Sequence, residues 1–156
     1  MRYHENMNQP FETNYREESW VGFYSDRILF YLIKRFNAYL QEKNLDIQVA
    51  ECAILKALYI AGDMSQSQIA QVLGKERSGI SRSIVSMEKK GYIIRKPLNG
   101  TTNVVSITEK GRSLMPELIR ITDSLEEQSF KGFSEKSRAS LLNNLSRIYK
   151  NLKVED

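Results

Sequence analysis

The chain has 156 residues, with 23 Lys and Arg, 19 Asp and Glu, and a formal net charge of +4. This length and a hydrophobic content of 41% are typical of one globular domain and exclude a disordered chain. A single cysteine excludes a disulfide framework, and a single histidine, His4 in a polar stretch, argues against a histidine-based metal site. We therefore expect neither a metal nor a cofactor.

The sequence also argues against a membrane protein. It has no run of 18 apolar residues, and its first residues, Met-Arg-Tyr-His-Glu-Asn, lack the apolar core of a secretion signal. We expect a cytoplasmic protein with no membrane partner.

The basic excess is concentrated in one segment. Residues 75–97 carry two acidic side chains and seven basic ones, namely Lys75, Arg77, Arg82, Lys89, Lys90, Arg95 and Lys96. Their net charge of +5 exceeds that of the whole chain. Such clustering is typical of a nucleic-acid footprint, although a solvated helix face gives the same pattern.

Helical periodicity covers the N-terminal third of the chain. After a polar arm at 1–18, apolar side chains recur at steps of three and four from Ser19 to about Lys43. Asp46 is a candidate N-cap for a second helix, which ends at Gly62.

Two helices follow in close succession. The Ser-x-x-Gln tetrapeptide at 65–68 is a capping box that begins a short helix, and Gly74 ends that helix. The next helix starts after Lys75 and runs to Lys90, with an inner stripe of Ile80, Ile84 and Met87.

The periodicity then changes to that of strands. Residues 92–98 and 101–107 favour a hairpin, because the Asn-Gly pair between them is a strong signal for a type I′ turn. In this register Leu98 faces Thr101 and Lys96 faces Asn103.

Two more helices are predicted at the C-terminal end. Thr108 can cap the first, in which Leu114, Leu118, Ile121 and Leu125 repeat in a heptad-like pattern. Ser134 can cap the second, which carries an apolar stripe of Leu141, Leu142, Leu145, Ile148, Tyr149 and Leu152.

Helix, tight turn, helix and hairpin together are typical of a winged helix-turn-helix. Ala70 is small enough for two helices to approach, Gly74 permits the positive φ of the turn, and Ile80 can hold the second helix against the first. The predicted fold class is mainly α, with a small β-hairpin wing.

The outward face of the helix after Lys75 indicates contact with DNA. Arg can bond guanine in bidentate fashion, and Ser can bond bases or phosphates. Gly79 lies inside this helix, where it costs about 1 kcal/mol relative to Ala. It indicates either close approach of the backbone to DNA or close packing against a neighbouring helix. The polar residues of this face are Arg77, Ser78, Ser81, Arg82 and Ser86.

Four runs of sequence occur in an order typical of a known family. They are the segment 65–74, Ser78-Gly79-Ile80-Ser81-Arg82, the segment 87–95, and Ile107-Thr108-Glu109-Lys110-Gly111. The last two are similar to the family signatures LEKKGLV.R and LTEKG. Over residues 20–152 the chain resembles the MarR family of winged helix-turn-helix transcriptional regulators.

The resemblance implies a homodimeric repressor that binds a pseudo-palindromic operator in double-stranded DNA. Helices at 19–45 and 109–156 would interlock with a second subunit, and the lobe at 46–108 would read one half-site. The apolar stripes of these flanking helices agree with a dimer, because one small lobe cannot bury three further helices. The expected DNA-binding residues are Ser65, Gln66, Ser67, Lys75, Arg77, Ser78, Gly79, Ser81, Arg82, Ser86, Lys89, Arg95, Lys96, Asn99 and Asn103.

The wing departs from the family pattern. The family's wing carries an Asp and one or two Arg at its tip, and the segment 97–103 has neither. We expect a weaker wing contribution, with Lys96 on phosphate and Asn99 or Asn103 forming hydrogen bonds. Arg77 and Arg82 would then contribute more of the affinity for DNA.

Regulators of this family often release DNA when a small phenolic ligand binds between the dimer helices and the lobe. The candidate residues for this effector pocket are aromatic, namely Trp20, Phe23, Tyr24, Tyr31 and Tyr59. The alternative is that these side chains form the core and the dimer interface. Cys52 lies in the second helix, whereas the family's sensing cysteine lies in the first, so we expect a structural thiol rather than a redox switch.

Two other functions fit parts of the pattern. A non-specific architectural DNA binder would explain the weaker wing, and a protein-interaction module could have lost DNA binding altogether. An enzyme is disfavoured, because the sequence lacks a G-x-x-x-x-G-K loop, a G-x-S-x-G motif and a second histidine.

Overall fold

The computed structural model describes residues 21–99 and 102–153. The elements follow in the order α1 (Val21–Glu42), α2 (Val49–Ala61), β1 (Met64–Ser65), α3 (Gln66–Leu73), α4 (Arg77–Lys89), β2 (Ile93–Asn99), β3 (Thr102–Ile107), α5 (Glu109–Ser129) and α6 (Glu135–Leu152). The predicted fold class, mainly α with a small wing, is confirmed. The polar arm, His4 and Trp20 lie outside the described residues.

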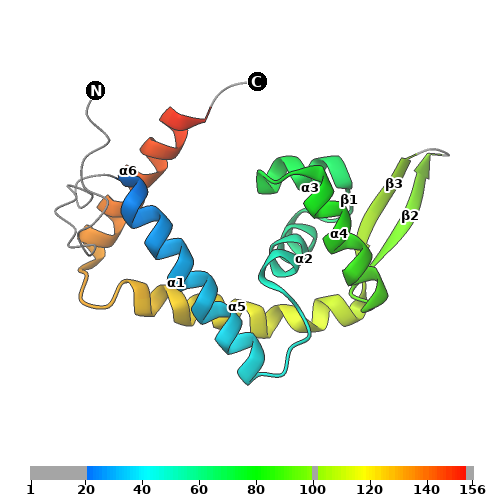
Figure 1. The fold of residues 1–156 in the computed structure, drawn as a ribbon, viewed down its shortest axis with the longest axis horizontal. Helices are drawn as coiled ribbons and strands as arrows, with labels where there is room; N and C mark the ends of the chain where they lie inside the picture. The colour runs from blue at the N-terminus through cyan, green and yellow to red at the C-terminus, as the bar shows by residue number, and fades with distance from the viewer. Residues whose placement is uncertain (1–20, 100–101, 154–156) are drawn as a thin grey trace, which may run out of the picture.

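The elements form a lobe and a set of flanking helices (Figure 1). The lobe contains α2, α3, α4 and the sheet, while α5 leads away from the wing and crosses α1 before the chain turns into α6. No helix in the described ranges is long and apolar enough to cross a membrane.

Three of the predicted helix caps are confirmed. The Ser65 hydroxyl accepts from the Gln68 amide at 3.2 Å, and the Ser65 amide donates to Gln68 Oε1 at 2.8 Å. Thr108 and Ser134 cap α5 and α6 by accepting from the amides of Gly111 and Ser137. These caps satisfy amides that the first turn of each helix leaves without a backbone partner.

The predicted cap at Asp46 is wrong. The helix begins two residues later, with Gln48 as its N-cap, because the Glu51 carboxylate accepts from the Gln48 amide at 2.9 Å. Asp46 is free for another partner, and its Oδ1 lies 3.3 Å from Lys90 Nζ.

The wing has one more strand than the sequence predicts. The short strand β1 pairs with β3, so the sheet is antiparallel with the order β1-β3-β2. A two-residue strand is too short to produce an alternating pattern of its own. It fastens the base of the wing to the start of α3.

The predicted hairpin register is also wrong. Lys96 pairs with Val104 and Pro97 with Asn103, and a register shift lies between Pro97 and Asn99. Proline has no amide hydrogen to give to the ladder, so it is found where pairing is irregular. Asn99 pairs with Thr102. The two residues between them, 100–101, lie outside the described ranges.

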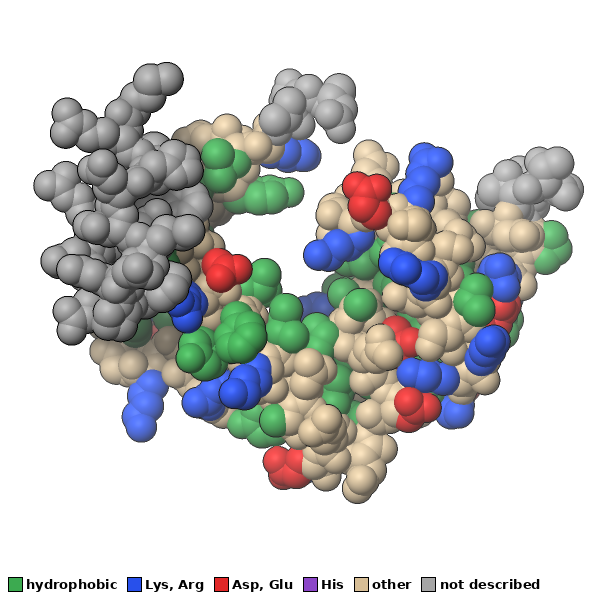
Figure 2. Space-filling model, viewed as in Figure 1, with side chains coloured by type: hydrophobic (Ala, Val, Ile, Leu, Met, Phe, Trp, Pro, Cys, Tyr) green, Lys and Arg blue, Asp and Glu red, His purple; other side chains and the backbone are tan. Residues whose placement is uncertain are grey.

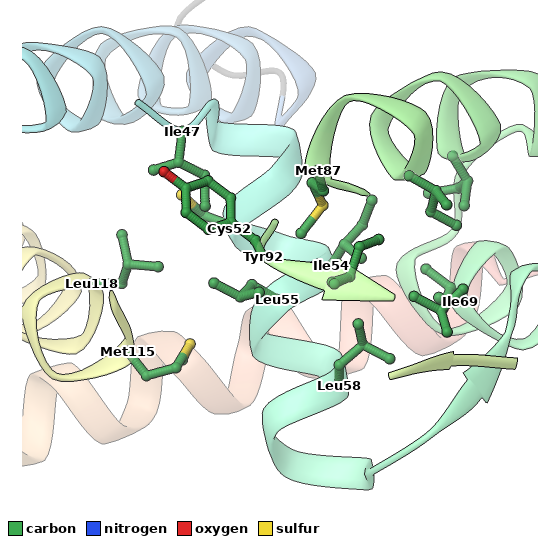
Figure 3. Close-up of a cluster of buried hydrophobic side chains, with 14 of the residues drawn as sticks. Ile47, Cys52, Ile54, Leu55, Leu58, Ile69, Met87, Tyr92, Met115 and Leu118 are labelled. Carbon is green, nitrogen blue, oxygen red and sulfur yellow. The ribbon is translucent and has the colours of Figure 1, made fainter. Parts of the chain in front are cut away.

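The core lies inside the lobe and continues onto α5 (Figure 3). Helix α2 supplies Ile54, Leu55 and Leu58, all fully buried. The inner stripe predicted for α4 is confirmed, because Ile80, Ile84 and Met87 are buried. In α5 the predicted Leu118, Ile121 and Leu125 are buried, and Met115 accompanies them while Leu114 is half-buried.

The flanking helices contribute little to this core. Leu40 is the one buried residue of α1, and α6 has none. Their apolar side chains face outward instead; on α1 these include Tyr24, Ile28, Leu29, Phe30 and Tyr31, and on α6 they are Leu141, Leu142, Leu145, Ile148, Tyr149 and Leu152.

Candidate nucleic-acid interface

Helix α4 presents one exposed side and two flanks. At 100° per residue, the side opposite the buried stripe carries Ser78, Arg82, Val85 and Lys89, all of them exposed. The predicted residues Arg77 and Ser81 lie on one flank, and Gly79 and Ser86 lie on the other. The helix therefore offers a polar, cationic outer surface while it is anchored through Ile80, Ile84 and Met87.

A groove runs along the second flank, between α4 and the start of α2. Its volume is about 630 Å³, and it is lined on the α4 side by Gly79, Arg82, Ser83 and Ser86. A Cβ added to Gly79 would meet nothing within 4 Å. The alternative that Gly79 serves close helix packing is therefore wrong, and close approach to DNA stays a prediction.

Arg95 is engaged by a carboxylate. Its Nε lies 3.1 Å and 3.2 Å from the two oxygens of Glu88, and a second nitrogen of the guanidinium completes a forked pair. This hydrogen-bonded pair lowers the pKa of Glu88 and raises that of Arg95. The pair joins the end of α4 to β2, so Arg95 orients the wing. Its guanidinium could bind a phosphate only while also bonded to Glu88.

Lys90 is engaged more deeply. Its Nζ lies 3.0 Å from Oε2 of the buried Glu51 and 3.3 Å from Asp46. Burial by itself would lower the pKa of Lys90, but hydrogen bonds to Glu51 and Asp46 outweigh that effect and raise it. Lys90 is therefore a structural cation at the base of the lobe.

Five basic residues of the segment 75–97 remain available for an external anion. The ion pairs found among the described residues involve Lys90 and Arg95 from this segment and leave Lys75, Arg77, Arg82, Lys89 and Lys96, all exposed. Figure 2 shows Lys and Arg side chains gathered on the lobe where α3 and α4 lie, with a few acidic ones among them. Helix and wing can therefore approach a phosphate backbone together.

The start of α3 carries three more of the predicted DNA-binding residues. Ser65, Gln66 and Ser67 form its cap and first turn, and the Ser67 side chain is exposed. The capping box already engages the amides of Ser65 and Gln68, so an anion favoured by the helix dipole would meet the other first-turn amides. A phosphate contact by the Ser-Gln-Ser segment stays a prediction.

The register shift separates Asn99 from the other two predicted wing residues. Lys96 and Asn103 are exposed on neighbouring strands, with Asn103 opposite Pro97. Asn99 ends β2, but its side chain and the residues 100–101 lie outside what the structure describes.

The described aromatic residues predicted for an effector pocket line neither the groove beside α4 nor the cavity between α1, α2 and α5. Phe23, Tyr24 and Tyr31 lie along α1, whereas Tyr59 lies on α2. The guanidinium carbon of Arg112 lies 5.9 Å from the centre of the Tyr59 ring. The cavity between α1, α2 and α5 has a volume of about 210 Å³. Its lining is Phe36, Val49, Cys52, Ala53, Lys56, Met115, Leu118, Ile119, Thr122 and Asp123.

The expected burial of Cys52 is confirmed. Its side chain is buried beside this cavity, and burial raises the pKa of the thiol to about 12. The nucleophilic thiolate is therefore scarce at neutral pH, as expected of a structural cysteine.

Two features of the site escaped sequence reasoning. Val85 lies on the exposed side of α4, and its spacing of three from Arg82 was a usable signal. The pairing of Glu51 with Lys90 joins residues 39 positions apart, and no local pattern indicates it.

Comparison with known proteins agrees with this geometry. Residues 45–100 match the model of the MarR family. Over 115 residues the chain is 24% identical to YybA of Bacillus subtilis, an HTH-type transcriptional regulator, covering 72% of this chain and 77% of YybA. Over 149 residues it is 24% identical to the HTH-type transcriptional repressor IacR of Pseudomonas putida, covering 94% and 88%.

The fold also matches a regulator solved on DNA. A MarR-family transcriptional regulator from Listeria monocytogenes, complexed with a 26mer DNA, has a TM-score of 0.78 and 26% identity over 85% of this chain and 89% of that one. All three of these relatives are named as transcriptional regulators or repressors. Residues 45–100 thus match the MarR family of DNA-binding winged helix-turn-helix transcriptional regulators, and the winged lobe and the cationic α4 agree with that match.

Proposed function

We propose that this regulator is a sequence-specific repressor that binds a pseudo-palindromic operator as a homodimer. The observation that carries the proposal is the exposed side of α4, where Arg82 and Lys89 accompany Ser78 on a well-anchored helix. IacR, which aligns with nearly the whole chain, is a repressor. In this proposal α4 enters the major groove, and the dimer bound to its operator blocks transcription.

The DNA contacts divide by chemistry. Arg82 and Ser78 face base edges, and Arg82 is suited to guanine O6 and N7. Lys75, Arg77, Lys89 and Lys96 neutralise phosphates, and the first turn of α3 holds a phosphate oxygen. Gly79, Ser81, Ser86, Arg95, Asn99 and Asn103 complete the proposed contact set.

The proposed partner in assembly is a second copy of the chain. Helix α6 has no buried residue in the single chain, and α1 exposes aromatic and aliphatic side chains on several turns. Contiguous apolar surface of this kind is typical of an interface. We assign 19–45 and 109–156 to dimerisation and 46–108 to DNA binding, which places two α4 helices about 34 Å apart on the duplex.

The same scheme includes a site for a small effector. The cavity between α1, α2 and α5 is mostly apolar, with Lys56 and Asp123 at its edge, and it joins the flanking helices to the lobe. An aromatic ligand with one polar group fits this lining. Binding there would change the spacing of the two lobes and release DNA.

The decisive experiment is fluorescence anisotropy with the full chain. DNA from upstream of its own gene is titrated against a scrambled duplex at two salt concentrations. A preference of about 10³ or more for the native duplex supports a specific regulator. Equal, salt-dependent binding to both duplexes would indicate an architectural role instead, and binding to neither at low salt would favour a protein-interaction module.

A further inference from the structure

The exposed side of α4 contains one apolar side chain. Val85 is 39% exposed and lies in the same row as Ser78, Arg82 and Lys89, opposite the buried stripe. The other three members of this row are polar or charged. Val85 therefore interrupts an otherwise hydrophilic surface at its centre.

Neither helix formation nor packing of the core accounts for a valine here. A β-branched residue has lower helix propensity than Ala, Arg or Lys, because the helix restricts its χ1 rotation. The core contacts of α4 are made by Ile80, Ile84 and Met87 on the opposite side. Valine at this exposed position leaves apolar surface in contact with water.

The electrostatic surroundings of Val85 permit close approach to DNA. Glu88, three residues further along α4, is held in a forked ion pair by Arg95. Its negative charge is thereby directed toward β2 and compensated. Arg82 and Lys89, the cationic neighbours of Val85 on its own row, show no ion pair among the described residues.

The chemistry of the major groove supplies one matching group. The 5-methyl of thymine is the apolar feature of the base edges there, and small apolar side chains contact it. Arg82 precedes Val85 by three residues, or about 4.5 Å along the helix axis. A base step is about 3.4 Å, so on a duplex whose major groove α4 follows these two side chains would face neighbouring base pairs.

We infer that Val85 is a specificity-determining residue, which contacts the 5-methyl group of a thymine one or two base pairs from the base that Arg82 reads. The inference rests on the proposed function, because it requires α4 to lie in the major groove of a specific site. It adds the identity of a base to that proposal.

The test removes one methyl group at a time from the DNA. The full chain first selects its preferred duplex from a random-sequence pool. Each thymine of that duplex is then replaced by deoxyuridine, which lacks only the methyl, and Kd is measured for the wild type, Val85→Ala and Val72→Ala. Val72 is the matched control, because it is an exposed valine on α3, outside the row of Val85.

The expected result is a loss at one thymine position in each half-site. Wild type and Val72→Ala should bind the deoxyuridine duplex roughly fourfold more weakly per methyl removed, and Val85→Ala should bind both duplexes equally. Selection of a defined duplex with no position at which Val85→Ala removes the methyl preference would overturn the inference alone. Failure to select any sequence would overturn the proposed function and the inference with it.

Discussion

Lys90 joins three parts of the lobe that are distant in sequence. Its ammonium lies between Glu51 on α2 and Asp46 in the loop before it, at the end of α4. Tyr92 donates from its hydroxyl to the Asp46 carbonyl at 3.2 Å and ties the same loop to the start of the wing. One oxygen of the Glu51 carboxylate has no hydrogen-bond partner, and the other accepts from the Gln48 amide and from Lys90, the cation in contact with it.

Removing the Lys90 ammonium should therefore cost folding stability. Lys90→Met leaves a buried carboxylate without its cation, and we expect the free energy of unfolding to fall by about 3 kcal/mol. Urea denaturation measures this loss, with the exposed neighbour Lys89→Met as the control expected to change little. Equal stability of the two variants would contradict a structural role for Lys90.

The same pair sets a dependence on pH. The pKa of Lys90 is raised above its ordinary value of 10.5, so the stabilising contribution is complete below that pH and is lost as the pH rises above it. Lys90→Met should remove this alkaline component from a plot of stability against pH.

Two glycines in helices should respond in opposite directions to the same substitution. A Cβ on Gly111 would lie 2.2 Å from the Tyr92 carbonyl oxygen, whereas one on Gly79 meets nothing within 4 Å. Gly111→Ala should destabilise the protein by about 3 kcal/mol through overpacking against backbone. Gly79→Ala should stabilise it by about 1 kcal/mol. Thermal unfolding measures both, and weaker DNA binding by a stabilised Gly79→Ala would support close approach of the α4 backbone to DNA.

At the scale of elements, α4 and the wing have unequal means of binding DNA. Helix α4 is anchored along its length by three buried side chains and exposes Arg82 and Lys89. The wing offers Lys96 and Asn103, while Arg95 is held by Glu88. We therefore expect α4 to determine sequence preference and the wing to add charge.

Substitutions in the two elements should differ in kind. Arg82→Ala should cost roughly 1–3 kcal/mol on the preferred duplex and relax its specificity, because a bidentate base contact is lost. Lys96→Ala should weaken binding to all sequences alike and lower the salt slope by about one. Anisotropy titrations over a range of salt measure both effects. If neither variant changes affinity or slope, the assignment of both elements to DNA is wrong.

At the scale of the molecule, α6 and much of α1 leave apolar side chains exposed in the single chain. The lobe buries its own core, but α6 buries nothing and α1 buries only Leu40 among the described residues. A helix gains most of its stability from packing of its apolar face, so α6 needs a partner to be stable.

A charge on the apolar stripe of α6 should separate the proposed dimer. The wild type should elute with light scattering at twice the chain mass of 18.1 kDa, and Leu145→Glu should elute as a monomer, because a glutamate would be buried without a cation. Asn143→Glu, on the opposite side of the same helix, is the matched control and should stay dimeric. A monomeric wild type would refute the dimer directly.

Local interactions were sufficient to predict much of this protein. The caps at Ser65, Thr108 and Ser134 depend on groups three residues apart, and the buried stripe of α4 follows from helical periodicity. The cationic face of α4 follows from the same periodicity. These features need no knowledge of where the rest of the chain lies.

Only the tertiary structure decided which of these residues are available for function. It paired β1 with β3, shifted the wing register at Pro97, and engaged Lys90 and Arg95 with Glu51 and Glu88. Each of these outcomes depends on groups brought together from separate elements, whose proximity is set by packing of the whole lobe. The sequence by itself determined where the charges lie along the chain, and packing decided which of them stayed free to meet DNA.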